Sequence, residues 1–446
     1  MLKVANQMAP AEPAQVDAAL RTFRLAADDA GASQAQPTLF AETGTEATSS
    51  TTTLVDEVAV GEKLYTRYIN EFWTARQRGG HSLHEISYRA CFKAELPRFF
   101  LSLLCPRGEA ETLVYDPFMG RGTTLLEAAL AGCRVAGNDA NPLSEILLRP
   151  RLEVPPLERI VERLEALRLD APAEEPDIDL SMFYARGTLR QLMNLRTWLN
   201  NRRQAGEEDA ADRWIRMVAT NRLSGHSSGF FSVYTLPPNQ AVSPQRQREI
   251  NARRNQTPSE RDVKAIILKK TRSLLRRLTA QQARQLRNVA QSALLMCEDA
   301  GNTPKLANES VDVVVTSPPF LNTVQYAQDN WLRCWFNGLN AESIARRITV
   351  TSSLQQWRAF IGSVMQELHR VVRPGGWVAF EVGEVRGGTL NLDEVVAPLG
   401  EAAGFRCVGL VINSQHFTKT ANCWGVDNNA KGTNTNRIVL LWKEPA

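Results

Sequence analysis

Two short stretches of this chain combine residue types that could do chemistry. The first is Thr316-Ser-Pro-Pro-Phe320, which directly follows residues 311–315, a short run dominated by valine. Such a β-branched run predicts a buried strand, and prolines cannot continue it because they have no N–H to donate. We therefore expect a rigid turn that holds a hydroxyl and an aromatic ring at the carboxyl end of a strand, where open α/β sheets bind ligands. Taken alone, a plain strand-ending turn explains these residues equally well.

The second stretch is the glycine turn Asp116-Pro-Phe-Met-Gly-Arg-Gly-Thr-Thr124. Residues 113–115 before it predict a short buried strand, and residues 123–131 predict a helix. Gly120 and Gly122 allow the backbone to approach a ligand closely. Strand, glycine turn and helix in this order are a general device for binding nucleotides. The glycine spacing matches neither the dinucleotide fingerprint nor a P-loop, so NAD and ATP are disfavoured.

Acidic residues follow the next two predicted strands. Asp139 comes just after residues 133–137, at the position where an acid holds the ribose hydroxyls in nucleotide-binding sheets. The alternative interpretation is that Asp139 is only the N-cap of a helix near Pro142, although the two roles are compatible. The third strand, residues 293–297, is followed by an acidic pair that includes Asp299.

The remaining elements must bring these stretches together. Helices are predicted at residues 354–372 and 392–403, and strands at residues 377–382, 408–412 and 438–442. Alternating strands and helices indicate a parallel sheet that is covered by helices on both faces. Residues 63–106 are rich in aromatic side chains, and we expect them to form a helical lead-in with aromatic core packing.

The composition is that of an ordinary soluble globular protein. The 446 residues suggest two or three domains, and 43% hydrophobic and 22% charged residues are typical values. No apolar run approaches the roughly 18–20 residues needed to cross a bilayer, and no secretory signal is visible. The seven cysteines include no Cys-x-x-Cys pair, so neither a zinc site nor a disulfide framework is indicated, and no metal is expected. These features favour a reduced, cytoplasmic compartment.

Two segments depart from the rest of the chain in charge. Residues 1–60 carry three basic and eight acidic side chains, and we expect most of them to be disordered apart from a short helix near residues 16–27. Residues 151–289 interrupt the alternation with amphipathic helices. Within them, residues 240–289 hold thirteen Lys or Arg against three acids, a net charge of +10. A charge run is usually a solvated helix face, but this imbalance favours binding to a polyanion.

The two motifs together resemble those of the S-adenosylmethionine-dependent DNA amino-methyltransferases. The glycine turn is similar to the family's Asp-Pro-Phe-x-Gly-x-Gly-Thr cofactor motif, and residues 316–320 are similar to its Ser/Asp/Asn-Pro-Pro-Tyr/Phe catalytic motif. The resemblance covers about residues 80–150 and 290–446. It implies an α/β fold with a Rossmann-like methyltransferase sheet that is mostly parallel and has an antiparallel last strand.

The resemblance also implies a domain organisation. Residues 61–150 and 290–446 would form the catalytic domain, preceded by residues 1–60 as the disordered segment. Residues 151–289 would be a helical, basic insertion that serves as the DNA target-recognition region. Known members place that region between the third and fourth strands or near a terminus, so this assignment rests on the charge and size of the insertion.

Residue roles follow from the resemblance. The cofactor S-adenosylmethionine would be bound by Phe92, Lys93, Asp116, Phe118, Gly120, Gly122, Thr123, Asp139 and Asp299. The target base would be held by Ser317, Pro318, Pro319 and Phe320. The predicted DNA contacts come from the charge of the basic run and not from the resemblance, and they are Lys269, Lys270, Arg272, Arg276 and Arg277.

The implied reaction is methyl transfer to an exocyclic amino group of a base flipped out of double-stranded DNA. Phe320 would stack on the base, while the Ser317 hydroxyl and the Pro318 carbonyl would accept hydrogen bonds from its amino group and localise the nitrogen lone pair. Serine at this position favours N4 of cytosine over N6 of adenine, and a restriction endonuclease acting on the same site would be a partner. Adenine-N6 methylation, RNA methylation and a non-catalytic nucleic-acid-binding module are the alternatives; the last would not explain both motifs.

Overall fold

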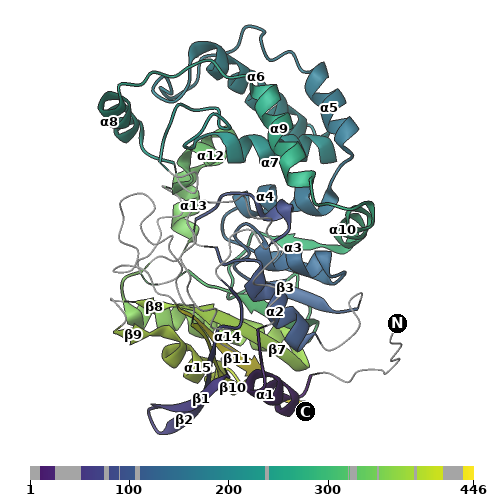
Figure 1. Ribbon diagram of the computed structural model, residues 1–446, viewed down its shortest axis with the longest axis vertical. Helices are drawn as coiled ribbons and strands as arrows, with labels where there is room; N and C mark the ends of the chain where they lie inside the picture. The colour runs from purple at the N-terminus through teal and green to yellow at the C-terminus, as the bar shows by residue number, and fades with distance from the viewer. Residues whose placement is uncertain are drawn as a thin grey trace, which may run out of the picture.

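The computed structural model describes residues 11–25, 52–74, 80–89, 91–105, 111–236, 241–319, 321, 329–348, 351–385, 389–414 and 435–445. These residues contain a nine-stranded sheet in the order β1-β2-β10-β11-β7-β6-β3-β4-β5 (Figure 1). Its central strands, all parallel to their neighbours within the group, are β3 (Leu113–Asp116), β4 (Arg134–Asn138), β5 (Leu294–Met296), β6 (Val311–Thr316) and β7 (Val372–Val382).

The last strand runs antiparallel to its two neighbours in the sheet. β11 (Thr435–Trp442) lies between β7 and β10 (Arg406–Ser414) and is antiparallel to both. The predicted Rossmann-like sheet, mostly parallel with an antiparallel last strand, is therefore confirmed. The order of the strands also reverses between β3 and β6, because β3 leads to β4 on one side and β6 leads to β7 on the other. The carboxyl ends of strands at such a switch point form the crevice in which open α/β sheets bind ligands.

Helices cover both faces of the sheet, as predicted. One face carries α2 (Glu95–Leu104), α3 (Thr123–Leu130) and α4 (Leu143–Glu153), and the other carries α14 (Leu354–Val371) and α15 (Leu392–Ala402). The burial of β6 on both faces of the sheet explains why its sequence is apolar at successive positions. Val313 and Val315 pack into the first core and Val314 packs into the second, and all three are fully buried.

A hairpin near the N-terminus extends the sheet. β1 (Leu54–Val60) pairs antiparallel with β2 (Lys63–Asn70), which pairs parallel with β10. α1 (Pro13–Arg21) packs beside the hairpin, where Asp17 accepts a hydrogen bond from the Tyr68 hydroxyl. The Asn413 side chain accepts hydrogen bonds from the backbone N–H groups of residues 72 and 73, at 2.7 and 3.2 Å, and so fixes the exit of the hairpin.

Two predictions are wrong in this region. Residues 54–60 form a strand rather than a disordered segment, and Tyr65 and Tyr68 lie in a strand rather than in helical surroundings. The short helix expected near residues 16–27 is present as α1, at residues 13–21. The physical reason is tertiary burial. Val16 and Leu20 of α1 enter the main core, and β2 gains a ladder with β10, which lies more than 300 residues along the chain. Neither of these contacts can be predicted from the local composition of the chain.

The insertion is helical, as predicted. It contains α5 (Leu157–Ala166), α6 (Arg186–Gln204), α7 (Ala210–Arg222), α8 (Pro244–Arg254) and α9 (Val263–Leu275) and forms the upper part of the molecule in Figure 1. The predicted end of the insertion at residue 289 falls inside α10 (Ala280–Ser292), which packs against α3 and α4 and leads into β5. The last helix of the basic run is therefore a crossover helix of the sheet.

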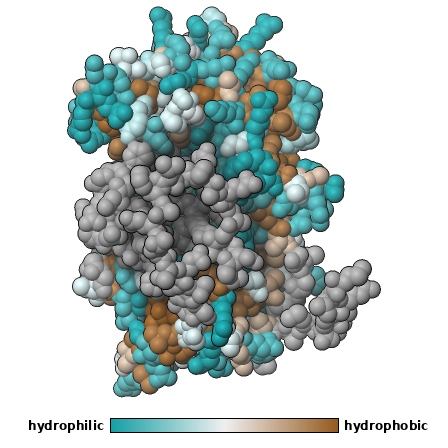
Figure 2. Space-filling view, in the orientation of Figure 1, coloured by the Kyte–Doolittle hydropathy of each residue, from teal (hydrophilic) through white to brown (hydrophobic). Residues whose placement is uncertain are grey.

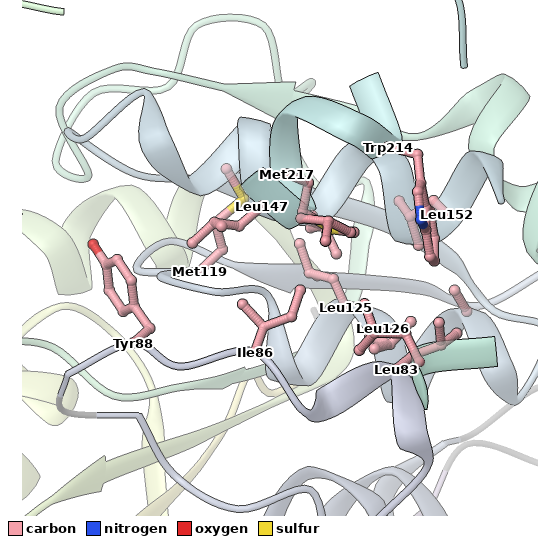
Figure 3. Close-up of a cluster of buried hydrophobic side chains, with 14 of the residues drawn as sticks. Leu83, Ile86, Tyr88, Met119, Leu125, Leu126, Leu147, Leu152, Trp214 and Met217 are labelled. Atoms are coloured by element: carbon pink, nitrogen blue, oxygen red, sulfur yellow. The ribbon is translucent and has the colours of Figure 1, made fainter. Parts of the chain in front are cut away.

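The core of the insertion is continuous with the first core of the sheet. Trp214 and Met217 of α7 belong to the same buried cluster as Leu125 and Leu126 of α3 (Figure 3). The indole N–H of Trp214 donates to the Thr271 hydroxyl of α9 at 3.0 Å and joins two helices of the insertion. The insertion consequently has no separate core that could move freely from the sheet.

The outer surface of the insertion is largely hydrophilic in the view of Figure 2. Within the described ranges, no helix combines the length and the apolar character needed to cross a bilayer.

Candidate functional site

An open cavity lies at the carboxyl ends of β3, β4, β5 and β6, at the switch point of the sheet, with about 700 Å³ of empty space that includes space open to solvent. It is lined by Tyr88, Pro117, Phe118, Gly120, Asp139, Ala140, Asn141, Glu298, Asp299, Ala300, Ser317, Pro319, Arg347, Ile348 and Phe360. The structure therefore brings together six of the residues singled out in the sequence, which come from four different strand ends: Phe118, Gly120, Asp139, Asp299, Ser317 and Pro319.

The two glycines of the turn have different tasks. Both have positive φ angles, 50° at Gly120 and 76° at Gly122. A Cβ on Gly122 would lie 2.6 Å from a methyl carbon of Leu148 in α4, so Gly122 is required by helix packing. A Cβ on Gly120 would meet nothing closer than the Tyr88 ring at 3.7 Å. The backbone at Gly120 is the one that faces the open cavity.

Asp139 is held in the cavity by backbone donors. Its two carboxylate oxygens accept hydrogen bonds from the N–H groups of Gly120 and Asn141, each at 2.8 Å. Burial raises the pKa of Asp139, and these hydrogen bonds oppose the rise. The prediction that Asp139 caps the following helix is wrong, because α4 begins after Pro142 and has no side-chain cap. The carboxylate instead joins the glycine turn to the end of β4 and keeps lone pairs available to a ligand.

Asp116 joins the two motifs beneath the cavity. The Thr316 hydroxyl donates to Asp116 Oδ1 at 2.6 Å, and the Phe118 N–H donates to the same oxygen at 3.1 Å. On the neighbouring helix, the Thr124 hydroxyl donates to the Val315 carbonyl at 2.9 Å. Burial raises the pKa of Asp116 to about 7. Asp116 is 1% exposed and does not line the cavity, so its observed contacts position the glycine turn against the Pro-Pro turn.

Four other residues predicted to bind the cofactor lie outside the lining. Gly122 and Thr123 are at the start of α3, where Thr123 accepts a hydrogen bond from Arg121 Nε at 3.2 Å. Phe92 and Lys93 precede α2, and both are partly buried. Phe92 packs against the main core. Burial lowers the pKa of Lys93. Their roles toward a cofactor stay predictions.

Tyr88 forms a wall of the cavity that the sequence analysis missed. Arg121, inside the glycine turn, donates to the carbonyls of His84 and Ile86 at 3.1 and 2.9 Å and so fastens this segment over the turn. The Tyr88 hydroxyl accepts a hydrogen bond from the Asn141 amide at 3.3 Å. The signal available in the sequence was an aromatic residue four positions before Phe92, which was predicted to bind the cofactor.

At the Pro-Pro turn, Ser317 and Pro319 line the cavity, and Pro318 is buried. The Pro319 carbonyl accepts a hydrogen bond from the Trp357 indole at 2.9 Å, which anchors the turn to α14. Phe320 lies outside the described residues.

Glu381 of β7 lies behind Ser317 and was not predicted. It is 7% exposed, and burial raises its pKa to about 6, although hydrogen bonds with the Ser317 and Asn436 side chains oppose the rise. The Asn436 amide donates to it at 3.0 Å. Ser317 therefore has a buried carboxyl as a partner for its hydroxyl.

The far end of the cavity combines flat apolar surfaces with acids. The Phe118 and Phe360 rings meet edge to face at 6.0 Å, and Ile348 lies beside them in the lining. Asp299 is exposed at the rim, and its carboxylate accepts the Gly301 N–H at 2.8 Å. Glu298 Oε2 is buried and has no hydrogen-bond partner among the described residues. Aromatic rings suit a ligand with a planar base, and carboxylates suit a diol, because its hydroxyl groups supply hydrogen-bond donors.

Three of the five basic residues assigned to DNA contacts serve the fold. Arg276 donates to both carboxylate oxygens of Glu85, one of which also lies 3.7 Å from Lys270 Nζ. Arg277 donates to the Gly80 carbonyl at 3.2 Å. Burial lowers the pKa of Lys270 to about 8. These contacts dock α9 onto the segment that leads to Tyr88. Lys269 and Arg272 are exposed on the same helix.

Comparison with known proteins gives partial matches. No model of a known protein family matches the chain. The type II methyltransferase M.MvaI of Kocuria varians is 30% identical over 115 residues, which is 25% of this chain and 25% of that protein. The match therefore spans about a quarter of the relative's length.

Two solved structures show lower similarity. A Thermus thermophilus protein assigned as a DNA modification methylase, in complex with S-adenosylmethionine, is 22% identical with a TM-score of 0.21 and covers 33% of this chain and 52% of that chain. The rRNA methyltransferase aviRa of Streptomyces viridochromogenes is 11% identical with a TM-score of 0.31 and covers 81% of this chain and 89% of that chain.

Proposed function

We propose that this protein is an S-adenosylmethionine-dependent DNA methyltransferase that modifies the exocyclic N4 of cytosine. The observation that carries the proposal is the 2.6 Å hydrogen bond between Asp116 and Thr316, which joins the two motifs at one cavity. Because of this junction, a nucleotide-type pocket on β3 and β4 adjoins a hydroxyl and a rigid Pro-Pro turn on β6. The partial match to a type II methyltransferase supports the same class of enzyme.

The cavity fits the proposed cofactor. Asp139 would accept hydrogen bonds from the ribose hydroxyls, since both its oxygens are oriented by backbone donors. Phe118, Ile348 and Phe360 would enclose the adenine, with Asp299 at its amino group. The methionine end would extend past Gly120 toward Ser317, where the backbone is open. When bound, S-adenosylmethionine supplies an electrophilic methyl group.

Ser317 would act on the amino group of the target base. When the Glu381 carboxylate is ionised, the Ser317 hydroxyl donates to it and turns its own lone pairs toward the base. Ser317 and the Pro318 carbonyl then accept hydrogen bonds from the two N–H groups of the base's amino group. These hydrogen bonds localise the lone pair on the amino nitrogen. When the amino nitrogen loses a proton, Ser317 Oγ receives it and Ser317 passes its own proton to Glu381. A carboxyl with a pKa of about 6 is suited to that task near neutral pH.

DNA would be held by exposed cations of the insertion. Lys269 and Arg272 remain available on α9, and α8 presents Arg253 and Arg254 in the same basic run. In Figure 1, α8 lies on the same side of the molecule as α12 (Trp331–Phe336) and α13 (Ala341–Arg347), the helices that follow the Pro-Pro turn. This placement supports a nucleic acid that spans the insertion and the cavity.

The test is mass spectrometry of nucleosides from duplex DNA incubated with the full chain and isotope-labelled S-adenosylmethionine. Labelled N4-methylcytosine is the expected product, and Ser317→Ala protein is the matched control. N6-methyladenine would contradict the choice of base and leave the site standing. In a parallel incubation with RNA, transfer of the label to RNA while DNA stays unlabelled would overturn the substrate class. The sequence of the modified sites, read from host DNA with and without the gene, tests the partnership with a restriction endonuclease.

A further inference from the structure

A buried hydrogen-bond junction lies behind the Tyr88 wall of the cavity. The Ser87 carbonyl accepts hydrogen bonds from the Asn221 amide of α7 and from the Arg333 guanidinium of α12, both at 3.0 Å. Asn221 is 2% exposed and Arg333 is 6% exposed. The two donors are distant in the chain from their acceptor and from each other, and they meet on the residue directly before a cavity-lining side chain.

The residues on both sides of Tyr88 are thus held from outside the sheet. After Tyr88, the Arg89 guanidinium donates to Asp329 at 2.7 Å. Asp329 belongs to the same segment as Arg333, which also donates to the Asn330 side chain at 2.7 Å. Tyr88 itself is 7% exposed, accepts a 3.3 Å hydrogen bond from Asn141 and packs over Gly120, and the Arg333 guanidinium lies 6.0 Å from the centroid of its ring. Arg333 therefore contacts both the ring and the residue that precedes it in the chain.

Burying a guanidinium costs free energy unless its donors are satisfied. Burial lowers the pKa of Arg333, and the nearby acid Asp329 is already bonded to Arg89. A core that needed only stability could use an apolar side chain here. A satisfied buried polar network instead fixes one arrangement of the groups that it joins. In Figure 3, the Ile86 side chain lies inside the core cluster, whereas Tyr88 lies at the edge of the same cluster.

From this geometry we infer that Asn221 and Arg333 are positioning residues for Tyr88. They hold the Ser87 carbonyl so that the Tyr88 ring stands as a wall of the cofactor cavity. Asn221 of the insertion and Arg333 of α12 therefore influence cofactor affinity without touching the cofactor. The inference rests on the proposed function only in taking the cavity as the S-adenosylmethionine site.

The test is calorimetric titration of S-adenosylmethionine and of S-adenosylhomocysteine into the full chain. Tyr88→Ala is expected to weaken binding about tenfold, as for the loss of one aromatic wall. Asn221→Ala is expected to weaken binding about threefold to tenfold in the wild-type background and to have almost no effect in the Tyr88→Ala background, because coupled residues are not additive. An equal loss in both backgrounds would overturn the inference, since it would indicate general destabilisation.

Two further variants separate the contacts of Asn221 and Arg333. Asn221 Oδ1 also accepts a hydrogen bond from Arg222 at 2.8 Å, so Arg222→Gln is the matched control and should bind the cofactor like the wild type. Arg333→Lys keeps a donor for Ser87 and should bind more tightly than Arg333→Gln. Thermal melting identifies any variant that fails to fold, and Asn221→Ala alone then decides the case.

The outcomes distinguish this inference from the proposed function. If the wild-type chain binds neither ligand, the proposed cofactor site fails and the inference fails with it. If the wild type binds and Tyr88→Ala weakens binding, but Asn221→Ala and Arg333→Gln do not, only the positioning role is wrong. These readouts do not depend on which base or nucleic acid is methylated.

Discussion

The carboxyl ends of the central strands, here called the sheet edge, and the insertion use charged side chains in opposite ways. At the sheet edge, Asp116, Asp139 and Glu381 are enclosed and held by hydroxyl, amide or backbone donors, and in the described part of the chain none of them is paired with Lys or Arg. Burial raises the pKa of all three. On α8 and α9, by contrast, the charges are exposed or paired with acids.

This contrast supports the proposed position of the site. An acid that is buried without a counter-charge reduces the stability of the fold, so its retention points to function. An exposed cation costs little and carries less information by itself. The sheet edge should therefore respond to single substitutions, whereas the insertion should respond to sums of charges. The following substitutions would break or sharpen this comparison.

Ser317→Ala should have the largest effect. We expect turnover to fall about 10²- to 10³-fold, as for the removal of other donors or acceptors at a reacting group. S-adenosylmethionine affinity should stay within about twofold, because Ser317 is assigned to the base and not to the cofactor. Single-turnover kinetics and calorimetry on the same preparation measure the two quantities. A matching loss of cofactor affinity would show that the two halves of the site are not separable.

Asp139→Ala should come next, with cofactor affinity reduced by about 1.5–3 kcal/mol through the loss of charge-assisted hydrogen bonds. Asp139→Asn is the matched control, because its amide oxygen can still accept one backbone N–H and preserve the turn. Calorimetry is expected to place Asp139→Asn between the wild type and Asp139→Ala. Unchanged affinity in a folded Asp139→Ala protein would contradict the ribose assignment.

The pH dependence of turnover tests Glu381. The carboxylate must be ionised to accept a proton from Ser317, and its pKa is raised to about 6, so turnover should fall as the pH drops through 6, approaching about tenfold per pH unit below it. Glu381→Gln should be slow at every pH and lack this limb. Asp116, with its pKa raised to about 7, titrates nearby, but it supports the glycine turn. Its titration should change cofactor affinity, which is measured over the same pH range.

The smallest effects are expected on the insertion. Lys269→Gln with Arg272→Gln should reduce the slope of log K against log salt by about 0.9 for each phosphate that is no longer neutralised. Lys270→Gln with Arg276→Gln is the matched pair of equal charge change, and it should mainly lower thermal stability by undoing the contacts with Glu85. Equal salt slopes for both double variants and the wild type would mean that α9 is a solvated face and does not bind DNA.

Much of the site could be predicted from the sequence because it depends on local backbone rules. Residues 311–315 could only be a strand, Pro318 and Pro319 could only end it, and Gly120 and Gly122 marked a turn with positive φ angles. Asp139 was found from its position after a strand, and each of these inferences uses neighbours within a few residues, where sequence and geometry are directly linked. Asp299 also follows a strand, but its role was assigned through the family resemblance.

Other features were decided by the tertiary structure, for a common physical reason. β1 and β2 are strands because β10 offers a ladder, Glu381 matters because β7 lies beside β6, and Tyr88 is a wall because Arg121 holds its segment. The use of Lys270 and Arg276 in docking α9 likewise depends on Glu85, which lies far away in sequence. The sequence by itself determined the strand ends that carry the proposed site residues. Only the packing of distant segments decided which side chains enclose it, because burial and hydrogen-bond partners are properties of the folded chain and not of local composition.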